Sequence, residues 1–276
     1  MSAARRSVAA VNDADCVAFL QWALPRLGLR WAGYRKVRRR ACKRIGRRMR
    51  ELGVAGVAAY RARLDAEPAE WRALAALCPI PISRFYRDRE VFDCLGAEVL
   101  PALARGARRL ECWSAGCASG EEPYTLAIQY RLSADMPGIP LRILGTDVDA
   151  RLLERARMAC YPPSSLKALP PAWRSQAFET RGRQFCLRDE YRQAVQLERQ
   201  DLAVEVPWRE FDLILCRNLA FTYFDAERAQ LTLRRIASRL RPGGALVIGI
   251  HERLPPPAAG FEPWPSCRAI FRLCTA

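Results

Sequence analysis

From residue 84 onward, apolar segments suited to strands alternate with amphipathic segments suited to helices, and this alternation limits the possible folds more than any other feature. Such a pattern is typical of a parallel α/β sheet with right-handed crossovers. We therefore predict the α/β class with a Rossmann-like sheet. The predicted strands are residues 110–116, 141–149, 193–201, 211–218 and 245–252. The predicted helices are residues 88–103, 123–132, 150–159 and 225–240, whereas residues 160–190 form a less regular stretch.

The residues before this region have a helical pattern instead. In the basic segment 35–50, RKVRRRACKRIGRRMR, ten of sixteen residues are basic and none is acidic, so it carries +10 of the chain's net charge of +16. The apolar residues of this region recur at helical spacing, at Val37, Ala41, Ile45, Met49 and Leu52. The proline-rich stretch PIPIS at 79–83 disfavours both helix and strand. We predict a small all-α domain over residues 1–80 and an α/β domain over 81–276.

Polar residues gather where the predicted strands end. They are Gly116, Glu121 and Glu122 after the first strand, Asp147 and Asp149 after the second, Asp201 after the third, and Arg217 and Asn218 after the fourth. In parallel sheets, ligands bind at the carboxyl ends of the strands. Each acid taken alone has an equally good explanation as a helix cap, but agreement at four strand ends favours a ligand site.

The loop between Gly116 and Gly120 narrows the choice of ligand. It has neither the G-x-G-x-x-G pattern of dinucleotide sites nor the lysine of a P-loop, and it leads into Glu121 and Glu122. A paired carboxylate disfavours phosphate. An adenosine joined to a cation suits acids at these positions, and S-adenosylmethionine, with a sulfonium, an ammonium and no phosphate, has this chemistry. We expect no metal, because the chain has a single histidine, His251.

The eleven cysteines are scattered, odd in number and mostly within apolar segments, so we interpret them as buried reduced thiols. No apolar run approaches the roughly 18 residues of a membrane span, and the N-terminus lacks the apolar core of a signal peptide. We expect a cytoplasmic protein, without membrane insertion, that is a monomer.

Several blocks, taken in order, resemble the signatures of the CheR family of chemoreceptor glutamate methyltransferases. They are RFYRDREVF, WSAGCASGEEPYTLAI, TDVD, FDLILCRN followed by YFD, and RPGG. The resemblance covers about residues 25–252, because the basic segment and MRELGV are similar to the helical N-terminal domain of that family. It implies a methyltransferase that uses S-adenosylmethionine to methylate glutamate carboxylates of a chemoreceptor-like protein.

The resemblance also implies roles for individual residues. The catalytic residues would be Arg87, Arg217 and Tyr223. The cofactor-binding residues would be Ser83, Arg87, Gly116, Glu122, Asp147, Asp201, Leu202, Arg217 and Asn218. Among them, Glu122 would meet the amino-acid end of the cofactor, Asp147 would bind the ribose hydroxyls, and Asp201 and Leu202 would lie at the adenine.

The sequence departs from the family pattern mainly on the acceptor side. Between Asn218 and Tyr223 there is one residue more than usual, so Thr222 competes with Tyr223 for the place beside the methyl acceptor. His251 stands where the family usually has serine. An arginine fork can hold a carboxylate in a fixed plane. Either Arg87 or Arg217 is a candidate for that task, and the alternative is that both are structural.

The basic segment 35–50 has three interpretations: a solvated face, a nucleic-acid contact, or a surface that recognises an acidic protein helix. The third agrees with methyl-accepting glutamates, and we favour it. Two classes of function follow. One is an enzyme that methylates protein carboxylates, and the other is a relative that keeps the cofactor but serves another acceptor (protein, small molecule or RNA) or acts as a regulatory module. The sequence leaves open whether residues 160–195 dock a receptor.

Overall fold

The computed structural model describes residues 12–133, 136, 138–258 and 260–274, and the chain divides into two compact units. One unit comprises residues 1–81 together with 222–227, and the other comprises residues 82–221 and 228–276. The short segment 222–227 thus belongs with the N-terminal helices, although it lies far along the chain. The predicted division at residue 80 made no allowance for such a segment.

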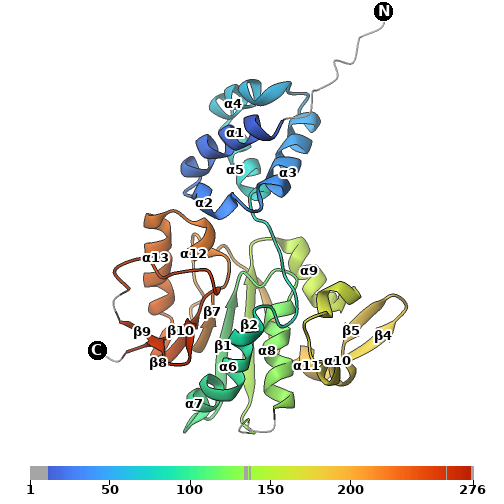
Figure 1. Ribbon diagram of the computed structural model, residues 1–276, viewed down its shortest axis with the longest axis vertical. Helices are drawn as coiled ribbons and strands as arrows, with labels where there is room; N and C mark the ends of the chain where they lie inside the picture. The colour runs from blue at the N-terminus through green and yellow to red at the C-terminus, as the bar shows by residue number, and fades with distance from the viewer. Residues whose placement is uncertain (1–11, 134–135, 137, 259, 275–276) are drawn as a thin grey trace, which may run out of the picture. The chain divides into compact units, whose positions relative to one another are not determined.

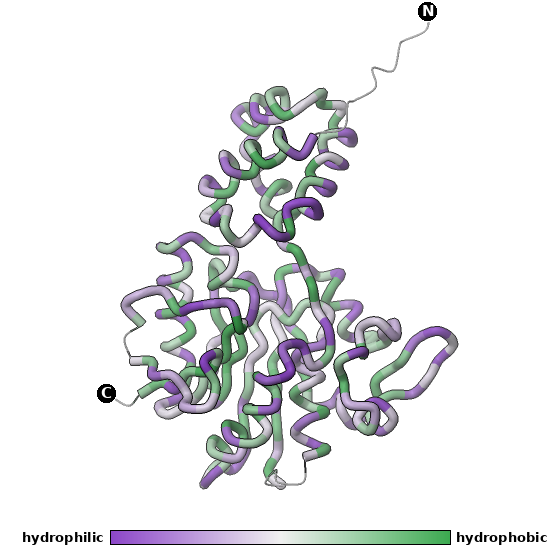
Figure 2. The backbone as a smooth tube through the Cα atoms, viewed as in Figure 1, coloured by the Kyte–Doolittle hydropathy of each residue, from purple (hydrophilic) through white to green (hydrophobic). Residues whose placement is uncertain are grey.

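The first unit is helical. Its helices are α1 (Asp13–Arg26), α2 (Trp31–Tyr34), α3 (Arg38–Glu51), α4 (Gly56–Ala66) and α5 (Pro68–Leu77). Helix α1 begins where the Asn12 side chain accepts a hydrogen bond from the Asp15 N–H, as an N-cap does. Helix α3 begins at Arg38, because Arg35–Val37 form a turn after α2. Its buried stripe consists of Ala41, Ile45, Gly46 and Met49, which confirms the helical spacing, and its hydrophilic remainder is visible in Figure 2.

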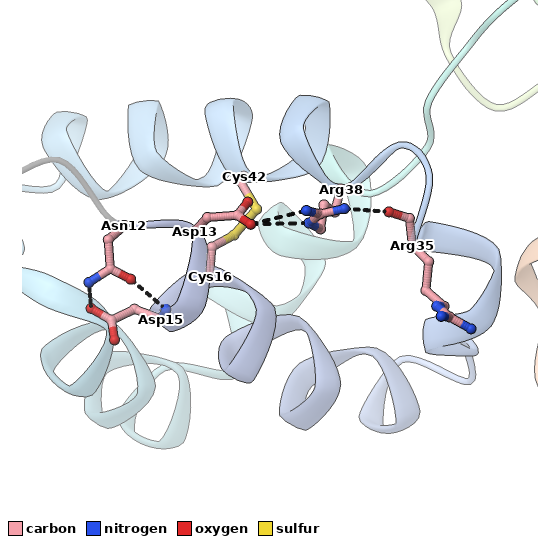
Figure 3. Close-up of a disulfide and its surroundings, with 7 residues drawn as sticks. All are labelled: Asn12, Asp13, Asp15, Cys16, Arg35, Arg38 and Cys42. Carbon is pink, nitrogen blue, oxygen red and sulfur yellow. Dashed lines mark hydrogen bonds and ion pairs between the residues drawn. A yellow bond between two sulfur atoms is a disulfide. The ribbon is translucent and has the colours of Figure 1, made fainter.

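Two disulfides contradict the interpretation as reduced thiols for four of the eleven cysteines, whereas the other seven are free thiols. Cys16 of α1 is bonded to Cys42 of α3, with Cα atoms 5.9 Å apart, and Cys160 is bonded to Cys186. Figure 3 shows the first bond beside an ion pair in which Arg38 reaches Asp13 at 3.1 Å. Both bonds join cysteines 26 residues apart in sequence, a separation at which spacing alone carries no pairing information.

The second unit is built on a seven-stranded sheet with the order β6-β2-β1-β7-β8-β10-β9 (Figure 1). Its strands are β1 (Leu110–Ala115), β2 (Leu141–Asp147), β6 (Val195–Arg199), β7 (Phe211–Leu215), β8 (Leu240–Val247), β9 (Phe261–Trp264) and β10 (Cys267–Leu273). The first five are parallel to one another, and β10 is antiparallel to both β8 and β9. The prediction of a Rossmann-like α/β sheet is confirmed.

Helices cover this sheet and complete its core. They are α6 (Arg89–Cys94), the π-helical η1 (Leu95–Val99), α7 (Leu100–Ala104), α8 (Glu121–Leu132), α9 (Ala150–Met158), α12 (Ala220–Tyr223) and α13 (Ala226–Ala237). All six residues of β1 are buried, as expected for a central parallel strand. Because its neighbours on both sides run parallel to it, the loops that follow these strands come together at one edge of the sheet.

The stretch at 160–190 forms a second, three-stranded antiparallel sheet with the order β3-β5-β4, which the sequence did not predict. Its strands are β3 (Cys160–Tyr161), β4 (Phe178–Arg181) and β5 (Gln184–Leu187), flanked by η2 (Pro163–Leu166), α10 (Pro171–Ala177) and α11 (Asp189–Arg192). Strands of two to four residues are too short to give a recognisable alternation. Across the described ranges, we find no helix with the length and apolarity that a membrane crossing requires.

Candidate active site

The centre of the site is Arg217, which lies two residues beyond the end of β7. Its side chain is 2% exposed and forms ion pairs with Asp88 at 2.8 Å and with Glu122 at 3.0 Å. One terminal nitrogen also donates to the Arg87 carbonyl at 2.7 Å, and the guanidinium lies over the Phe92 ring at 5.2 Å from its centre. Arg217 therefore ties the segment that opens α6 to the first turn of α8.

The loop from β1 to α8 is closely packed at its first glycine. Gly116 has φ of 77°, and a Cβ there would come within 2.3 Å of the Leu219 side chain, so glycine is required. Glu121 is buried, where it accepts a hydrogen bond from the Ser119 hydroxyl at 2.9 Å. Glu122 accepts one from the Ser114 hydroxyl at 2.7 Å. The carboxylate that was expected to face the cofactor's cation thus also faces the cation of Arg217.

Asp147 occupies the carboxyl end of β2, beside the same loop. Its two oxygens accept hydrogen bonds from the backbone N–H groups of Asp149 and Ala118, both at 2.9 Å. Burial raises the pKa of the Asp147 carboxyl above its ordinary value, and those backbone donors offset part of the rise. The two backbone donors thus fix the orientation of this carboxylate at the end of β2.

Four non-glycine residues around these loops have left-handed backbone conformations, which typically cost about 1–3 kcal/mol each. They are Tyr86 (φ 56°), Asp88 (56°), Ala118 (50°) and Asn218 (55°). Such strain tends to persist at functional sites, where the surrounding structure enforces it. Its concentration at the three loops that contribute Asp88, Glu122 and Arg217 distinguishes this edge of the sheet as the candidate site.

The other expected residues are spread more widely. Asp201 is exposed and caps its own turn by accepting from the Ala203 N–H at 2.9 Å, and Leu202 beside it is buried. Ser83 is half-buried. Arg87, also half-buried, directs one terminal nitrogen to the Ile82 carbonyl.

Tyr223 and Thr222 belong to the helical unit. There the Tyr223 ring lies 4.9 Å from the Tyr34 ring, and the Tyr223 carbonyl accepts from the Arg30 N–H at 2.8 Å. A Cβ on Gly33 would come within 2.2 Å of the Thr222 carbonyl oxygen. The backbone of both residues is thus held closely by α2 and the turn before it.

Three functional candidates escaped the sequence analysis. Asp88 pairs with Arg217, Ser114 hydrogen-bonds to Glu122, and Glu252 accepts the Asn218 N–H at 2.8 Å. Asp88 follows Arg87 in FYRD and Glu252 ends GIHE, so proximity to a motif was the available signal. Ser114, within an apolar strand, offered none.

The donor set fits S-adenosylmethionine. Two carboxylates, Asp88 and Glu122, surround one guanidinium, so the cluster around Arg217 has a net negative charge that suits a sulfonium and an ammonium. Asp147 supplies acceptors at the next strand end. Within the described part of the chain, no group of three or more histidine, cysteine or acidic side chains is placed to hold a metal ion.

Replacing Asp147 with alanine should weaken S-adenosylmethionine binding by about 1.5–3 kcal/mol, the scale for loss of a charged hydrogen-bond acceptor. Isothermal calorimetry on the folded variant measures this change. Because the pKa of Asp147 is raised, protonation begins at higher pH than for an ordinary aspartate, and affinity should fall as the pH drops through that pKa. The Asp147→Asn variant should lack this dependence. Unchanged affinity in the alanine variant would exclude the ribose assignment.

Comparisons with known proteins agree with this geometry. Residues 82–269 match the family model described as the CheR methyltransferase, SAM binding domain. A chemotaxis protein methyltransferase of Listeria innocua is 38% identical over 184 residues, which are 66% of this chain and 69% of that protein. Chemotaxis protein methyltransferase 2 of Pseudomonas aeruginosa is 31% identical over 217 residues, 76% of each chain.

A third relative extends the similarity into the helical unit. The chemotaxis protein methyltransferase of Salmonella typhimurium is 31% identical over 258 residues, covering 88% of this chain and 85% of that protein. The family match, the sheet order and the acids at the strand ends lead to one conclusion. This chain belongs to the CheR methyltransferase family and carries its S-adenosylmethionine-binding domain.

Proposed function

We propose that this protein methylates glutamate side chains in an acidic helical segment of a chemoreceptor-like protein. The similarity to chemotaxis protein methyltransferases supports the general class of partner. The observation that supports an acidic acceptor segment is the distribution of cations on α3. We assign the helical domain to residues 1–80 and the catalytic domain to 81–276.

Four of the five exposed cations of α3 form a row opposite its buried stripe. This cation row consists of Arg40, Lys43, Arg47 and Arg50. They follow one another at steps of three, four and three residues, so at about 100° per residue they share one face of the helix. Among the described residues, Arg47 alone of the row forms an ion pair, a 3.6 Å contact with Glu51 in which both side chains are more than half exposed. Exposed pairs of this kind contribute at most about 1 kcal/mol.

Other cations of the same helix serve the fold. Arg48 pairs with buried Glu70 at 2.7 Å, and Arg38 pairs with Asp13. Arg44 donates to the Leu77 carbonyl at 3.3 Å. Since these three arginines are engaged within the unit, the exposed cations are the part of the segment left for a partner, and the cation row is the largest set of them on one face. The cation row runs along most of α3, so it can face a negatively charged helix of similar length. Because its charges are exposed, they can also attract an acidic partner from a distance.

The chemistry needs little from the protein beyond alignment. A glutamate acceptor has an unperturbed pKa of about 4.3, so it is ionised at neutral pH and requires no general base. When bound, S-adenosylmethionine supplies a methyl group on a positively charged sulfur, and the acceptor oxygen forms its bond to that carbon as the sulfur–carbon bond breaks. Holding the carboxylate in line and excluding water are the tasks left to this chain.

We assign these tasks to residues on both sides of the site. Arg217, with Asp88 and Glu122 on its two terminal nitrogens, positions the loops around the cofactor. Arg87 is a better candidate than Arg217 for binding the acceptor carboxylate. Its guanidinium donates to the Ile82 carbonyl, whereas that of Arg217 forms two ion pairs. We retain Tyr223 on the acceptor side, with Thr222 as the competing residue.

Incubation with methyl-labelled S-adenosylmethionine and a host lysate should place label on protein in a form that mild alkali removes as methanol. Methyl esters are base-labile, whereas methylated amines are not. The Asp147→Ala variant is the control for labelling that depends on the site. Alkali-stable label, or label recovered in RNA, would contradict the carboxylate proposal and favour the other acceptors.

A cytoplasmic location is part of the same proposal. In that compartment thiol systems keep cysteines reduced, so the Cys16–Cys42 and Cys160–Cys186 bonds would be transient.

A further inference from the structure

One buried carboxylate joins the loops that follow β7 and β8. Glu252 is 8% exposed, and its Oε2 atom accepts two backbone hydrogen bonds. One comes from the Asn218 N–H at 2.8 Å, and the other from the Gly249 N–H at 2.6 Å. Both donors lie just beyond strand ends at the edge of the sheet that carries the candidate site. The carboxylate thus clamps two loops that are not otherwise adjacent in sequence.

The clamped residue is in a conformation that it would rarely adopt alone. Asn218 has φ of 55°, in the left-handed region that favours glycine. Its side chain is packed as closely as its backbone, because a Cβ on Gly249 would come within 2.3 Å of Asn218 Nδ2 and 2.9 Å of Glu252 Oε2. Gly249, Asn218 and Glu252 therefore form one tightly fitted unit, with no room for a side chain at the glycine.

Loss of the carboxylate would release both constraints. The buried Gly249 N–H and the partly buried Asn218 N–H would lose their acceptor, and a buried donor without a partner is costly. The strained backbone of Asn218 would then relax toward a commoner conformation, since such strain persists only where the surroundings enforce it. The neighbouring residue is Arg217, so a shift here reaches the centre of the site.

We propose that Glu252 is a positioning residue that holds Asn218 in its left-handed conformation and thereby shapes the cofactor side of the site. This inference rests on the proposed function, because Asn218 is assigned to the cofactor by family resemblance. Glu252 acts through Asn218 and has no role of its own in the transfer. The nearby GIHE motif drew attention to His251, whereas the structure assigns the role to the residue after it.

The test compares Glu252→Ala with Glu252→Gln, whose carbonyl oxygen can still accept both N–H groups. Calorimetry should show S-adenosylmethionine binding weakened about 10- to 100-fold in the alanine variant, and within about threefold of wild type in the glutamine variant. If the alanine variant does not fold, Glu252→Asp, whose side chain is one methylene shorter, replaces it with an expected loss of about tenfold.

Asp212→Ala is the matched control. Asp212 is a carboxylate of the same unit that also accepts a backbone N–H, from Glu111 at 2.8 Å, but it lies at the amino end of β7. It should lower the melting temperature and leave cofactor affinity unchanged. Equal loss of affinity in the alanine and glutamine variants, or wild-type affinity in the alanine variant, would overturn the inference. Failure of the wild-type protein itself to bind S-adenosylmethionine would instead overturn the proposed function.

Discussion

Replacing Arg217 with alanine should remove about 3–5 kcal/mol of unfolding free energy and most of the affinity for S-adenosylmethionine. The guanidinium is almost fully buried between Asp88 and Glu122, and its removal leaves two carboxylates without their cation. Breaking a buried ion pair from one side is strongly destabilising for this reason. Because Arg217 is buried between both carboxylates, its loss should affect stability as well as binding.

Urea unfolding and calorimetry measure the two effects. Arg217→Lys should recover little, because one ammonium cannot reproduce the two-sided contact of a guanidinium. The control is Arg142→Ala, which removes an exposed arginine near the start of β2 and should alter neither quantity. A folded Arg217→Ala variant with wild-type stability would mean that Asp88 and Glu122 do not depend on this cation.

Reversing the four charges of the cation row should raise the KM for an acidic protein substrate by about 10- to 100-fold at low salt. The variant is Arg40→Glu, Lys43→Glu, Arg47→Glu and Arg50→Glu together. All four side chains point away from the buried stripe, so the helix should still pack. The Kd for S-adenosylmethionine should stay unchanged, and the difference in KM should shrink as added salt screens the charges.

A matched control changes the net charge equally at another place. The control variant reverses four exposed arginines of the α/β unit: Arg105, Arg108, Arg142 and Arg268. Their reversal should change KM by no more than about twofold. If both variants lose activity to the same extent, net charge rather than the α3 surface attracts the substrate, and the proposed docking role of α3 is wrong.

The sequence predicted those features that depend on local pattern. The buried central strand β1 and the acids at successive strand ends follow from period and position along the chain, and both are present. Helix α3 appeared in the spacing of its apolar residues. These features need no knowledge of which distant segments meet.

Features that depend on distant contacts were missed. Asp88 and Arg217 are 129 residues apart, and Glu252 reaches Asn218 across 34 residues. The Cys16–Cys42 bond requires that α1 pack on α3, which no spacing rule encodes. The small sheet at 160–190 has strands of only two to four residues, so its alternation was too short to recognise. In each case the missing information was three-dimensional proximity.

The membership of residues 222–227 in the helical unit has a consequence for how the chain folds during synthesis. Leu29 forms an isolated bridge with Phe224, and the Asp225 N–H donates to the Gly28 carbonyl at 3.0 Å. The ribosome adds about 5–20 residues per second. Phe224 and Asp225 therefore emerge on the order of ten seconds after Gly28 and Leu29, which they contact. The contacts that complete the helical unit therefore form only after β7 has been synthesised, so this unit reaches its full set of contacts late although it begins the chain.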